Sequence, residues 1–241
     1  MSVRVSGKLK SLLRPETRVV VFTGAGVSAE SGVPTFRGQD GLWKKFRVEE
    51  LATPEAFEAD PQRVWEWYSW RREKILNVEP NPGHLALSEF EKYFTDFTLI
   101  TQNVDGLHEK AGSRKTLKLH GDIWEIRCTR CGVSRQDFTA PLRPLPPTCV
   151  CGGYLRPGVV WFGESLPAGV FEQAVQRTEN CDLFFSVGTS AEVYPAAYLP
   201  SIARQGGAYV VEVNVEASAA AHCADELLLG KSGEILPALL N

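Results

Sequence analysis

Short apolar runs alternate with amphipathic stretches along most of the chain. The apolar runs are rich in β-branched residues and end in small or polar residues, which is typical of buried parallel strands that meet loops. These runs occur at 18–26, 97–103, 116–121, 182–190 and 208–214. Helical patterns lie before or between them, at 6–13, 60–76, 83–94, 195–207 and 232–240. Strands that alternate with helices predict an α/β fold with a doubly wound parallel sheet.

One segment breaks this alternation. Residues 127–157 hold four cysteines, and prolines at 141, 144, 146 and 147 exclude a long helix or a central strand there. We therefore expect a small module inserted into the α/β domain. The predicted division is an α/β domain of 1–126 and 158–241, an inserted module of 127–157, and a helical part of the small domain at about 38–95.

Composition narrows the class of protein. The 241 residues are 44% hydrophobic, which is enough for one substantial core. The net charge is −3 without a long basic block, so we expect no direct nucleic-acid binding. No stretch approaches the roughly 20 apolar residues of a membrane helix, so we expect no membrane association. The N-terminal stretch lacks the apolar core of a secretory signal and predicts a surface helix, with a transit peptide as the alternative. We expect a cytoplasmic monomer.

Four of the six cysteines form two close pairs that are typical of a zinc site. The pattern is C-x2-C, a gap of 17 residues, and C-x-C, and its members are Cys128, Cys131, Cys149 and Cys151. Two close pairs can place four thiolates around one tetrahedral Zn²⁺. A closed set of four thiolates leaves no position for water, so the predicted metal is structural. Cys181 and Cys223 flank apolar runs and are predicted to be buried thiols.

A glycine-rich turn follows the first predicted strand. Residues 24–29, GAGVSA, have the pattern G-x-G-x-x-A, which lets the backbone approach a pyrophosphate. An ordinary dehydrogenase has an acidic residue about 20 positions further on, at the end of a second strand, and the sequence has no strand there. Instead, residues 28–43 form an irregular loop with Phe36 and Arg37, which can close over a ligand.

Polar residues follow several of the other predicted strands. They are Gln102, Asn103 and Asp105 after the second strand, Gly188, Thr189 and Ser190 after a later one, and Asn214 at the end of the next. Together they fit a ribose-rich ligand at the carboxyl edge of the sheet, although each alone is ordinary loop chemistry. His120 also ends a strand and is a usable base near neutrality, or else a satisfied structural residue. His84 and His108 are predicted to be structural.

Residues 66–73, EWYSWRRE, place three aromatic residues and two arginines on one predicted helix. Tyr68 and Arg71 are three positions apart and therefore share a face. The pair can read a ligand carboxylate; alternatively Tyr68 packs, and Arg71 pairs with Glu66 or Glu73. Arg72 points to a different face, and we expect it to be solvated.

Six stretches together resemble the sirtuin family of NAD-dependent protein deacylases. They are GAGVSAESGVPTFR, TQNVDGLHEKAG, LHGD, the four cysteines, GTSAEVYPA and VNVE, in the family's order from about residue 16 onward. The resemblance implies a large Rossmann-like domain with a small zinc-ribbon module. It implies NAD-binding roles for Gly24, Ala25, Gly26, Ser28, Glu30, Phe36, Arg37, Gln102, Asn103, Asp105, Gly188, Thr189, Ser190, Asn214, Glu216 and Ser232.

The resemblance also implies a chemistry. His120 matches the general base and Asn103 a catalytic partner beside the nicotinamide, while zinc takes no part. The stretch 159–164, VVWFGE, resembles the strand that pairs with an acylated-lysine peptide, which gives Val159, Trp161, Phe162 and Gly163 substrate-binding roles.

The Tyr-x-x-Arg pair resembles the sirtuin subgroup that prefers acidic acyl groups. It implies that Tyr68 and Arg71 read the carboxylate of succinyl- or malonyl-lysine, with weaker activity on acetyl-lysine. A plain deacetylase, an ADP-ribosyltransferase and a non-catalytic module that binds zinc and nucleotide are the alternatives.

Overall fold

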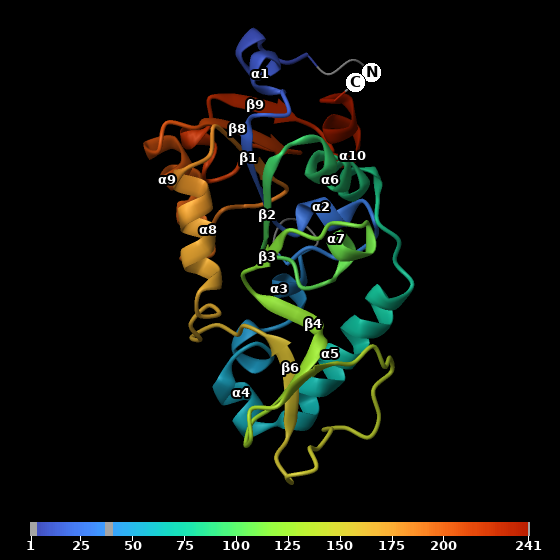
Figure 1. Cartoon of the computed structure of the whole chain (residues 1–241). Coiled ribbons are helices and arrows are strands. Elements are labelled where there is room, and N and C mark those ends of the chain that lie inside the picture. Colours follow the sequence, from blue (N-terminus) through green and yellow to red (C-terminus); the bar gives the residue numbers. More distant parts are fainter. Residues whose placement is uncertain (1–3, 37–40, 241) are drawn as a thin grey trace.

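The larger part of the molecule is built around a six-stranded parallel sheet (Figure 1). The computed structural model describes residues 4–36 and 41–240. The strand order is β3-β2-β1-β7-β8-β9, and every neighbouring pair is parallel. The strands are β1 (Arg18–Thr23), β2 (Asp96–Thr101), β3 (Thr116–Lys118), β7 (Leu183–Val187), β8 (Tyr209–Asn214) and β9 (Glu226–Leu229). The predicted doubly wound sheet is confirmed.

Helices cover both faces of this sheet, as the apolar runs require. Val19 and Val21 pack on one face with α1 (Gly7–Leu12), α6 (Pro82–Tyr93) and α10 (Ser232–Ile235). Val20 and Phe22 pack on the other face with α8 (Val170–Glu179) and α9 (Leu199–Gln205). Because successive side chains of a strand point to opposite faces, a strand buried on both faces has an uninterrupted apolar sequence.

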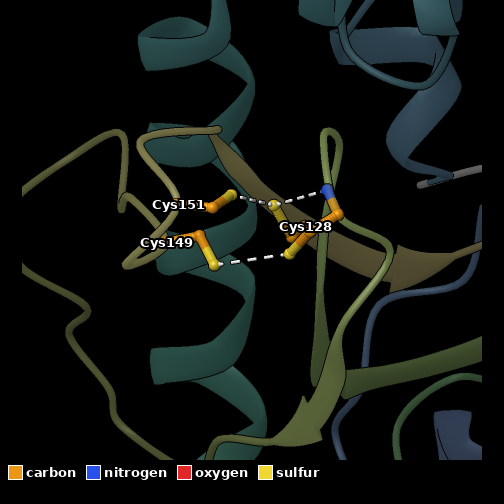
Figure 2. Close-up of side chains that lie close together, drawn as sticks. Cys128, Cys149 and Cys151 are labelled. Carbon is orange, nitrogen blue, oxygen red and sulfur yellow. Dashed lines mark hydrogen bonds between the residues drawn. The ribbon is translucent and has the colours of Figure 1, made fainter.

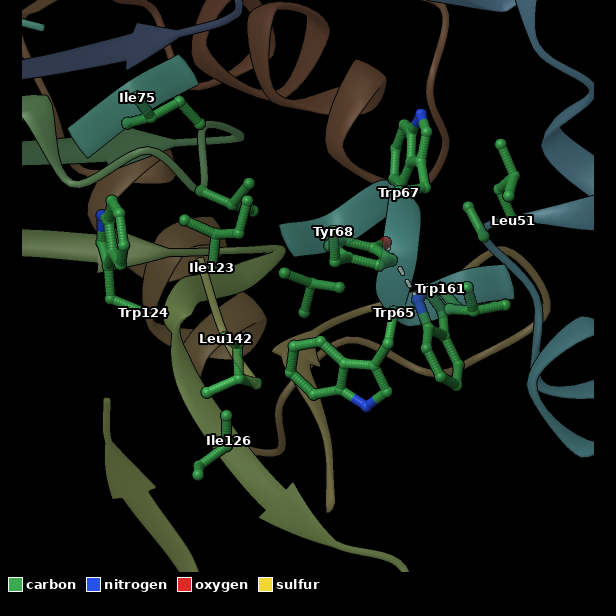
Figure 3. Packing of buried hydrophobic residues seen from close by; sticks show 14 of the residues in the cluster. Leu51, Trp65, Trp67, Tyr68, Ile75, Ile123, Trp124, Ile126, Leu142 and Trp161 are labelled. Carbon is green, nitrogen blue, oxygen red and sulfur yellow. Dashed lines mark hydrogen bonds between the residues drawn. The ribbon is translucent and has the colours of Figure 1, made fainter. Parts of the chain in front are cut away.

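A second, smaller region lies beyond the carboxyl edge of the parallel sheet (Figure 1). Its antiparallel sheet has the order β5-β4-β6, with β4 (Gly121–Cys128), β5 (Ser134–Gln136) and β6 (Leu155–Val159). Helix α5 (Pro61–Leu76) packs on β4 and β6. We call β4, β5, β6, α4, α5 and the cysteine loops the small region. Its core is aromatic, with Trp65, Trp67, Tyr68, Trp124 and Trp161 in one cluster (Figure 3).

The other elements are short. They are α2 (Gly26–Ala29), α3 (Leu42–Lys45), α4 (Pro54–Ala59), α7 (Leu107–Lys110), η1 (Val48–Glu50), η2 (Ala196–Tyr198), η3 (Ala221–Cys223) and η4 (Leu236–Ala238). In the part of the chain that the structure describes, none of the helices has the length and apolar character to cross a membrane. The division at residues 126 and 158 stays a prediction.

Local signals explain where the main helices begin. The Asp60 side chain accepts a hydrogen bond from the N–H of Arg63, and Pro61 occupies the first turn of α5. Pro200 does not weaken α9, because it lies in the first turn, where its missing N–H has no helical partner. Sequence reasoning missed α8, β9, β4 and β5. It also placed a strand at 159–164, whereas β6 spans Leu155–Val159 and residues 160–164 lie outside it. It also predicted a longer final helix, but α10 ends at Ile235 and is followed by the 3-10 turn η4.

Candidate active site and cysteine cluster

A cavity of about 790 Å³ separates the carboxyl edge of the parallel sheet from the small region. Most of the predicted site residues line it. They are Gly24, Ala25, Gly26, Phe36, Tyr68, Arg71, Gln102, Asn103, His120, Val159, Trp161, Phe162, Gly163, Gly188, Thr189, Ser190, Asn214 and Glu216. The lining does not include Ser28, Glu30, Asp105 or Ser232. Arg37 lies outside the described residues.

The glycines of the loop after β1 allow a close contact with the loop after β7. The N–H of Gly26 donates to the carbonyl oxygen of Gly188 over 2.8 Å. A Cβ atom on Gly26 would lie 2.7 Å from that same oxygen, and one on Gly24 would lie 2.7 Å from Cβ of Thr189. These approaches exclude any side chain. The two loops therefore present a backbone-lined wall to the sheet end of the cavity.

A buried hydrogen-bond network supports this wall from behind. Asn103 donates from Nδ2 to the carbonyl oxygen of Gly24 at 3.0 Å. The Ser28 hydroxyl donates to Asp105 Oδ2 at 2.8 Å, and the N–H of Leu107 donates to Asp105 Oδ1 at 2.9 Å. Burial raises the pKa of Asp105. Ser28 and Asp105 thus hold Asn103 and the glycine loop in place, and their predicted roles in NAD binding stay predictions.

Glu30 and Ser232 contact each other instead of the cavity. Ser232 donates from its hydroxyl to Glu30 Oε1 at 2.9 Å, and the N–H of Gly233 donates to the same oxygen at 2.9 Å. The pair connects the end of α2 to the start of α10. Their predicted contacts with the nucleotide stay predictions.

His120 is held in the tautomer that a general base needs. Its Nδ1 lies 3.1 Å from the carbonyl oxygen of Gln102. A carbonyl can only accept, so Nδ1 carries the proton and the lone pair of Nε2 is available. Burial lowers the pKa of His120, and the hydrogen bond to Gln102 opposes that shift only in part. The imidazole is therefore neutral at pH 7.

The other two histidines of the motifs are structural, as expected. The His84 ring packs 4.9 Å from the ring of His108, measured between centroids, and both residues are buried. His84 also takes part in the capping box of α6 with Asn81. Burial lowers the pKa of His84 to about 4 and that of His108 well below its usual range.

The opposite end of the cavity is aromatic and holds a buried cation. Arg71 is only 6% exposed, and its Cζ lies 4.7 Å from the ring centre of Phe36 and 5.0 Å from that of Trp67. Across residues 4–36 and 41–240, its guanidinium forms no hydrogen bond or ion pair, so Glu66 and Glu73 are not its partners. Burial lowers the pKa of Arg71, but an arginine remains charged at pH 7.

Tyr68 lies beside Arg71 and keeps its proton. Its hydroxyl accepts a hydrogen bond of 3.0 Å from Nε1 of Trp161. Burial raises the pKa of Tyr68 to about 12. Sequence reasoning missed Trp67, although its position four residues before Arg71 places both on one helix face. It also missed Glu164, for which no local pattern gives a signal.

The expectation that Arg72 is solvated was wrong. Its side chain is fully buried, and Nε donates to the carbonyl oxygen of Ile123 at 2.8 Å. Ile123 lies where the register between β4 and β6 is interrupted, from Gly121 to Ile126. Arg72 therefore satisfies a strand carbonyl that the irregular ladder leaves available, and so attaches α5 to β4.

The four predicted cysteines meet at one point in the small region (Figure 2). Their sulfur atoms all lie within 4.8 Å of one another, with 3.5 Å between Cys128 and Cys151 and 3.8 Å between Cys131 and Cys149. A tetrahedral zinc–sulfur distance of about 2.3 Å requires sulfur–sulfur separations of about 3.8 Å. The N–H of Cys131 points at Sγ of Cys128 and lowers the pKa of that thiol to about 6, which favours the thiolate. The cluster fits a structural zinc ion.

Comparisons with known proteins agree with this geometry. The model of the Sir2 family matches residues 24–195. A protein of Aquifex aeolicus named NAD-dependent protein deacylase is 56% identical over 208 residues, which are 86% of this chain and 87% of that protein. NAD-dependent protein deacylase 2 of Pyrobaculum aerophilum is 54% identical over 95% of this chain and 92% of its own length.

Solved structures extend the likeness to the whole fold. A mutant Sir2 homologue in complex with ADP-ribose is 48% identical and superposes with a TM-score of 0.94 over 98% of this chain and 95% of its own. The structure of Sir2Af2 bound to a myristoylated histone peptide is 35% identical, with a TM-score of 0.77 over 97% of this chain and 93% of its own. The chain is therefore an enzyme of the Sir2 family, the sirtuins, as its motifs predict.

Proposed function

We propose that this chain is an NAD-dependent protein deacylase that prefers lysine acyl groups with a terminal carboxylate, succinyl and malonyl. It removes acetyl groups more slowly. The general activity follows from membership of the Sir2 family and from the relatives named NAD-dependent protein deacylase. The preference rests on one observation: a buried guanidinium, Arg71, lines the cavity without an anionic partner among the described residues.

A buried cation without a counter-charge is unfavourable, so the site is expected to bind an anion. Transfer of a charged group from water is strongly disfavoured unless the group is paired and hydrogen-bonded. Asp105 acts on Arg71 electrostatically, but its carboxylate already accepts hydrogen bonds from Ser28 and Leu107 and forms no ion pair with the guanidinium. A ligand carboxylate can accept two hydrogen bonds from the guanidinium fork.

Tyr68 supplies a further donor at the same end of the cavity. Its phenol stays protonated at pH 7, because burial raises its pKa to about 12. Ala52 is buried in the same wall, and its small side chain leaves room for a two- or three-carbon acid. An acetyl group would bind next to the guanidinium without satisfying it, which explains the expected lower rate.

The sheet end of the cavity has the groups that the reaction requires. The expected reaction converts acyl-lysine, NAD and one water into free lysine, nicotinamide and O-acyl-ADP-ribose, with the ribose of NAD as the acceptor of the acyl group. His120 takes a proton at Nε2 from a ribose hydroxyl and so prepares that hydroxyl to attack the acyl carbon. Asn103 and the glycine loop orient the ribose. The backbone of Val159–Gly163, which continues from the end of the edge strand β6 at Val159, pairs with the substrate peptide.

Five further properties belong to this proposal. The zinc ion is structural, because four thiolates close its coordination. The chain acts as a monomer and binds no nucleic acid directly, in keeping with its net charge of −3. A cytoplasmic location is supported by the six cysteines, none of which forms a disulfide. The predicted domain division remains part of the proposal as well.

The decisive experiment compares Arg71→Met with the wild type on peptides that differ only in the acyl group. Loss of a charged hydrogen bond to the acyl carboxylate is worth about 1.5–3 kcal/mol, so kcat/KM for succinyl-lysine should fall about 10- to 100-fold. The value for acetyl-lysine should stay within about threefold. Release of nicotinamide measures both.

Arg63→Met is the matched control, because Arg63 is an exposed arginine on the same helix that pairs with Glu50. It should leave both rates unchanged. Equal losses on succinyl- and acetyl-lysine in Arg71→Met would show that Arg71 is structural, and would support a plain deacetylase. Labelled NAD that marks the protein substrate, without O-acyl-ADP-ribose, would support the ADP-ribosyltransferase alternative.

A further inference from the structure

We propose that Arg156 and Glu164 are positioning residues for carboxylate recognition, acting through Trp161 on the hydroxyl of Tyr68. Neither residue needs to touch the acyl group. The inference rests on the proposed preference for acidic acyl groups. It adds residues that affect this preference indirectly, by positioning Tyr68, to the Tyr-x-x-Arg pair that contacts the acyl group.

Arg156, near the start of β6, and Glu164, in the loop after β6, form a half-buried bidentate ion pair. The two guanidinium nitrogens of Arg156 lie 2.5 and 2.8 Å from the two carboxylate oxygens of Glu164. Arg156 is 7% exposed and also donates to the carbonyl oxygen of Val159 at 3.0 Å. The pair is therefore screened by solvent less than the exposed ion pairs of this protein, although the Glu164 side chain is 22% exposed.

This ion pair holds Trp161 at two points. Glu164 Oε2 accepts the backbone N–H of Trp161 at 2.8 Å. Cζ of Arg156 lies 3.4 Å from the ring centre of Trp161, so the flat guanidinium stacks on the indole. Both the backbone and the ring of Trp161 are fixed as a result.

A tight turn brings Glu164 back to this position. The N–H of Glu164 donates to the carbonyl oxygen of Trp161 at 3.1 Å, and Gly163 between them has a φ of 87°. That angle is unfavourable for residues with a side chain. The chain therefore reverses directly after Trp161 and returns the carboxylate to Arg156.

The fixed indole of Trp161 determines how the hydroxyl of Tyr68 forms hydrogen bonds (Figure 3). An indole nitrogen can only donate, so Nε1 of Trp161 makes the Tyr68 oxygen an acceptor, over 3.0 Å. The phenol has one proton, and no residue that the structure describes accepts it. Because Tyr68 lines the cavity, that proton is left for a ligand acceptor. A fixed indole therefore presets Tyr68 as a donor to the acyl carboxylate.

The alternative is that the ion pair only stabilises the fold. A structural role would lower the rates on all acyl groups alike, or none, and would not depend on Tyr68. A positioning role changes the ratio of kcat/KM for succinyl-lysine to that for acetyl-lysine, and only while the phenol hydroxyl is present.

The test is Arg156→Lys, which keeps the charge and loses the flat fork and the stacking. The succinyl-to-acetyl ratio should fall about fivefold, because a displaced indole weakens the hydrogen bond from the Tyr68 hydroxyl to the acyl carboxylate without abolishing it, with the acetyl rate within about twofold of wild type. Tyr68→Phe should give a similar fall. Arg156→Lys added to Tyr68→Phe should then lower the ratio no further.

Two other variants make the result decisive. Arg18→Lys is the matched control, because Arg18 forms a bidentate but exposed pair with Asp182 far from the cavity, and it should change nothing. Glu164→Gln replaces Arg156→Lys if the lysine variant loses its thermal transition, and it should lower the ratio in the same direction.

The inference is overturned if Arg156→Lys and Glu164→Gln leave the ratio unchanged, or if they still lower it in the Tyr68→Phe background. Such a result, with Arg71→Met still selective against succinyl-lysine, removes the positioning role alone. If Arg71→Met also fails to change the ratio, the proposed preference itself is wrong.

Discussion

The two regions that face each other across the cavity are stabilised in different ways. The parallel-sheet region has a core of aliphatic residues and phenylalanines between helices, and its polar groups at the strand ends bond to neighbouring loops, as Asn103 does to Gly24. The small region has a core of tryptophans that also contains charged groups. Its buried arginines are Arg71, Arg72 and Arg156.

The difference suggests how the enzyme divides its work. In the parallel-sheet region the hydrogen bonds of the wall are made before any ligand arrives, so the groups for NAD and proton transfer are preset. In the small region Arg72 and Arg156 have protein acceptors, whereas Arg71 has none among the described residues. In the proposed function, the general chemistry belongs to the parallel-sheet region and the discrimination between acyl groups to the small region.

Removal of zinc should have the largest effect on the structure and should destabilise only the small region. Structural zinc contributes on the order of 10 kcal/mol in small zinc modules, so a strong chelator should release the loops that carry the four cysteines. Hydrogen exchange should then rise in β4, β5 and β6, while β1, β2 and β7 remain protected. Deacylation should fall by more than about tenfold and recover when zinc is added back.

Zinc content of variants provides the control. Cys131→Ala should lose the one bound zinc per chain, whereas Cys181→Ala should keep it, because Cys181 is a buried thiol outside the cluster. Equal loss of protection in both sheets on chelation would contradict the separation of the two regions.

The sequence predicted the parallel-sheet region well, because the patterns that specify this region lie within short stretches of the chain. β-Branched runs and the polar residues that follow them specify buried strands and a ligand edge, and helix α5 has clear start signals in Asp60 and Pro61. The cluster of four cysteines was predicted equally well, since their spacing alone indicates a tetrahedral site.

The small region was harder to predict because its contacts join distant residues. Tyr68 and Trp161 are 93 positions apart, and Arg72 reaches Ile123 across 51 positions. Nothing local distinguishes Arg71 from Arg72, which are adjacent and chemically identical. Their environments depend on how α5 lies on β4, where an irregular register leaves a carbonyl for Arg72.

The two adjacent arginines should respond in opposite ways to the same substitution. Arg72→Met leaves the carbonyl oxygen of Ile123 buried without a donor, so the free energy of unfolding should fall by about 1–3 kcal/mol. Arg71→Met removes a buried cation that has no protein partner, so stability without ligand should stay the same or rise. Urea unfolding followed by fluorescence measures both.

The exposed Arg63→Met on the same helix should change stability by less than about 0.5 kcal/mol. A loss in Arg71→Met as large as that in Arg72→Met would mean that Arg71 stabilises the apo protein, and the contrast between ligand-binding and structural arginines would be lost.

The smallest effect expected is that of pH, and it should be shared by both substrates because it arises on the sheet side. Burial lowers the pKa of His120, so the imidazole is the free base at pH 7 and becomes protonated only below its usual value of about 6.5. The rate should change less than about twofold between pH 7.5 and 6.5. It should then fall through one midpoint, the same for succinyl- and acetyl-lysine, since an acyl carboxylate stays ionised until pH is near 4.

Thermal unfolding at each pH separates this titration from loss of structure. His84 has a folded pKa of about 4, so between pH 6.5 and 4 the unfolded state binds a proton that the folded state does not, and stability declines as pH falls. Rates are therefore compared only where the protein remains folded. His120→Ala should lose about 100-fold or more of activity on both substrates and show no such midpoint. Different midpoints for the two acyl groups would instead place the titrating group in the small region, beside Arg71.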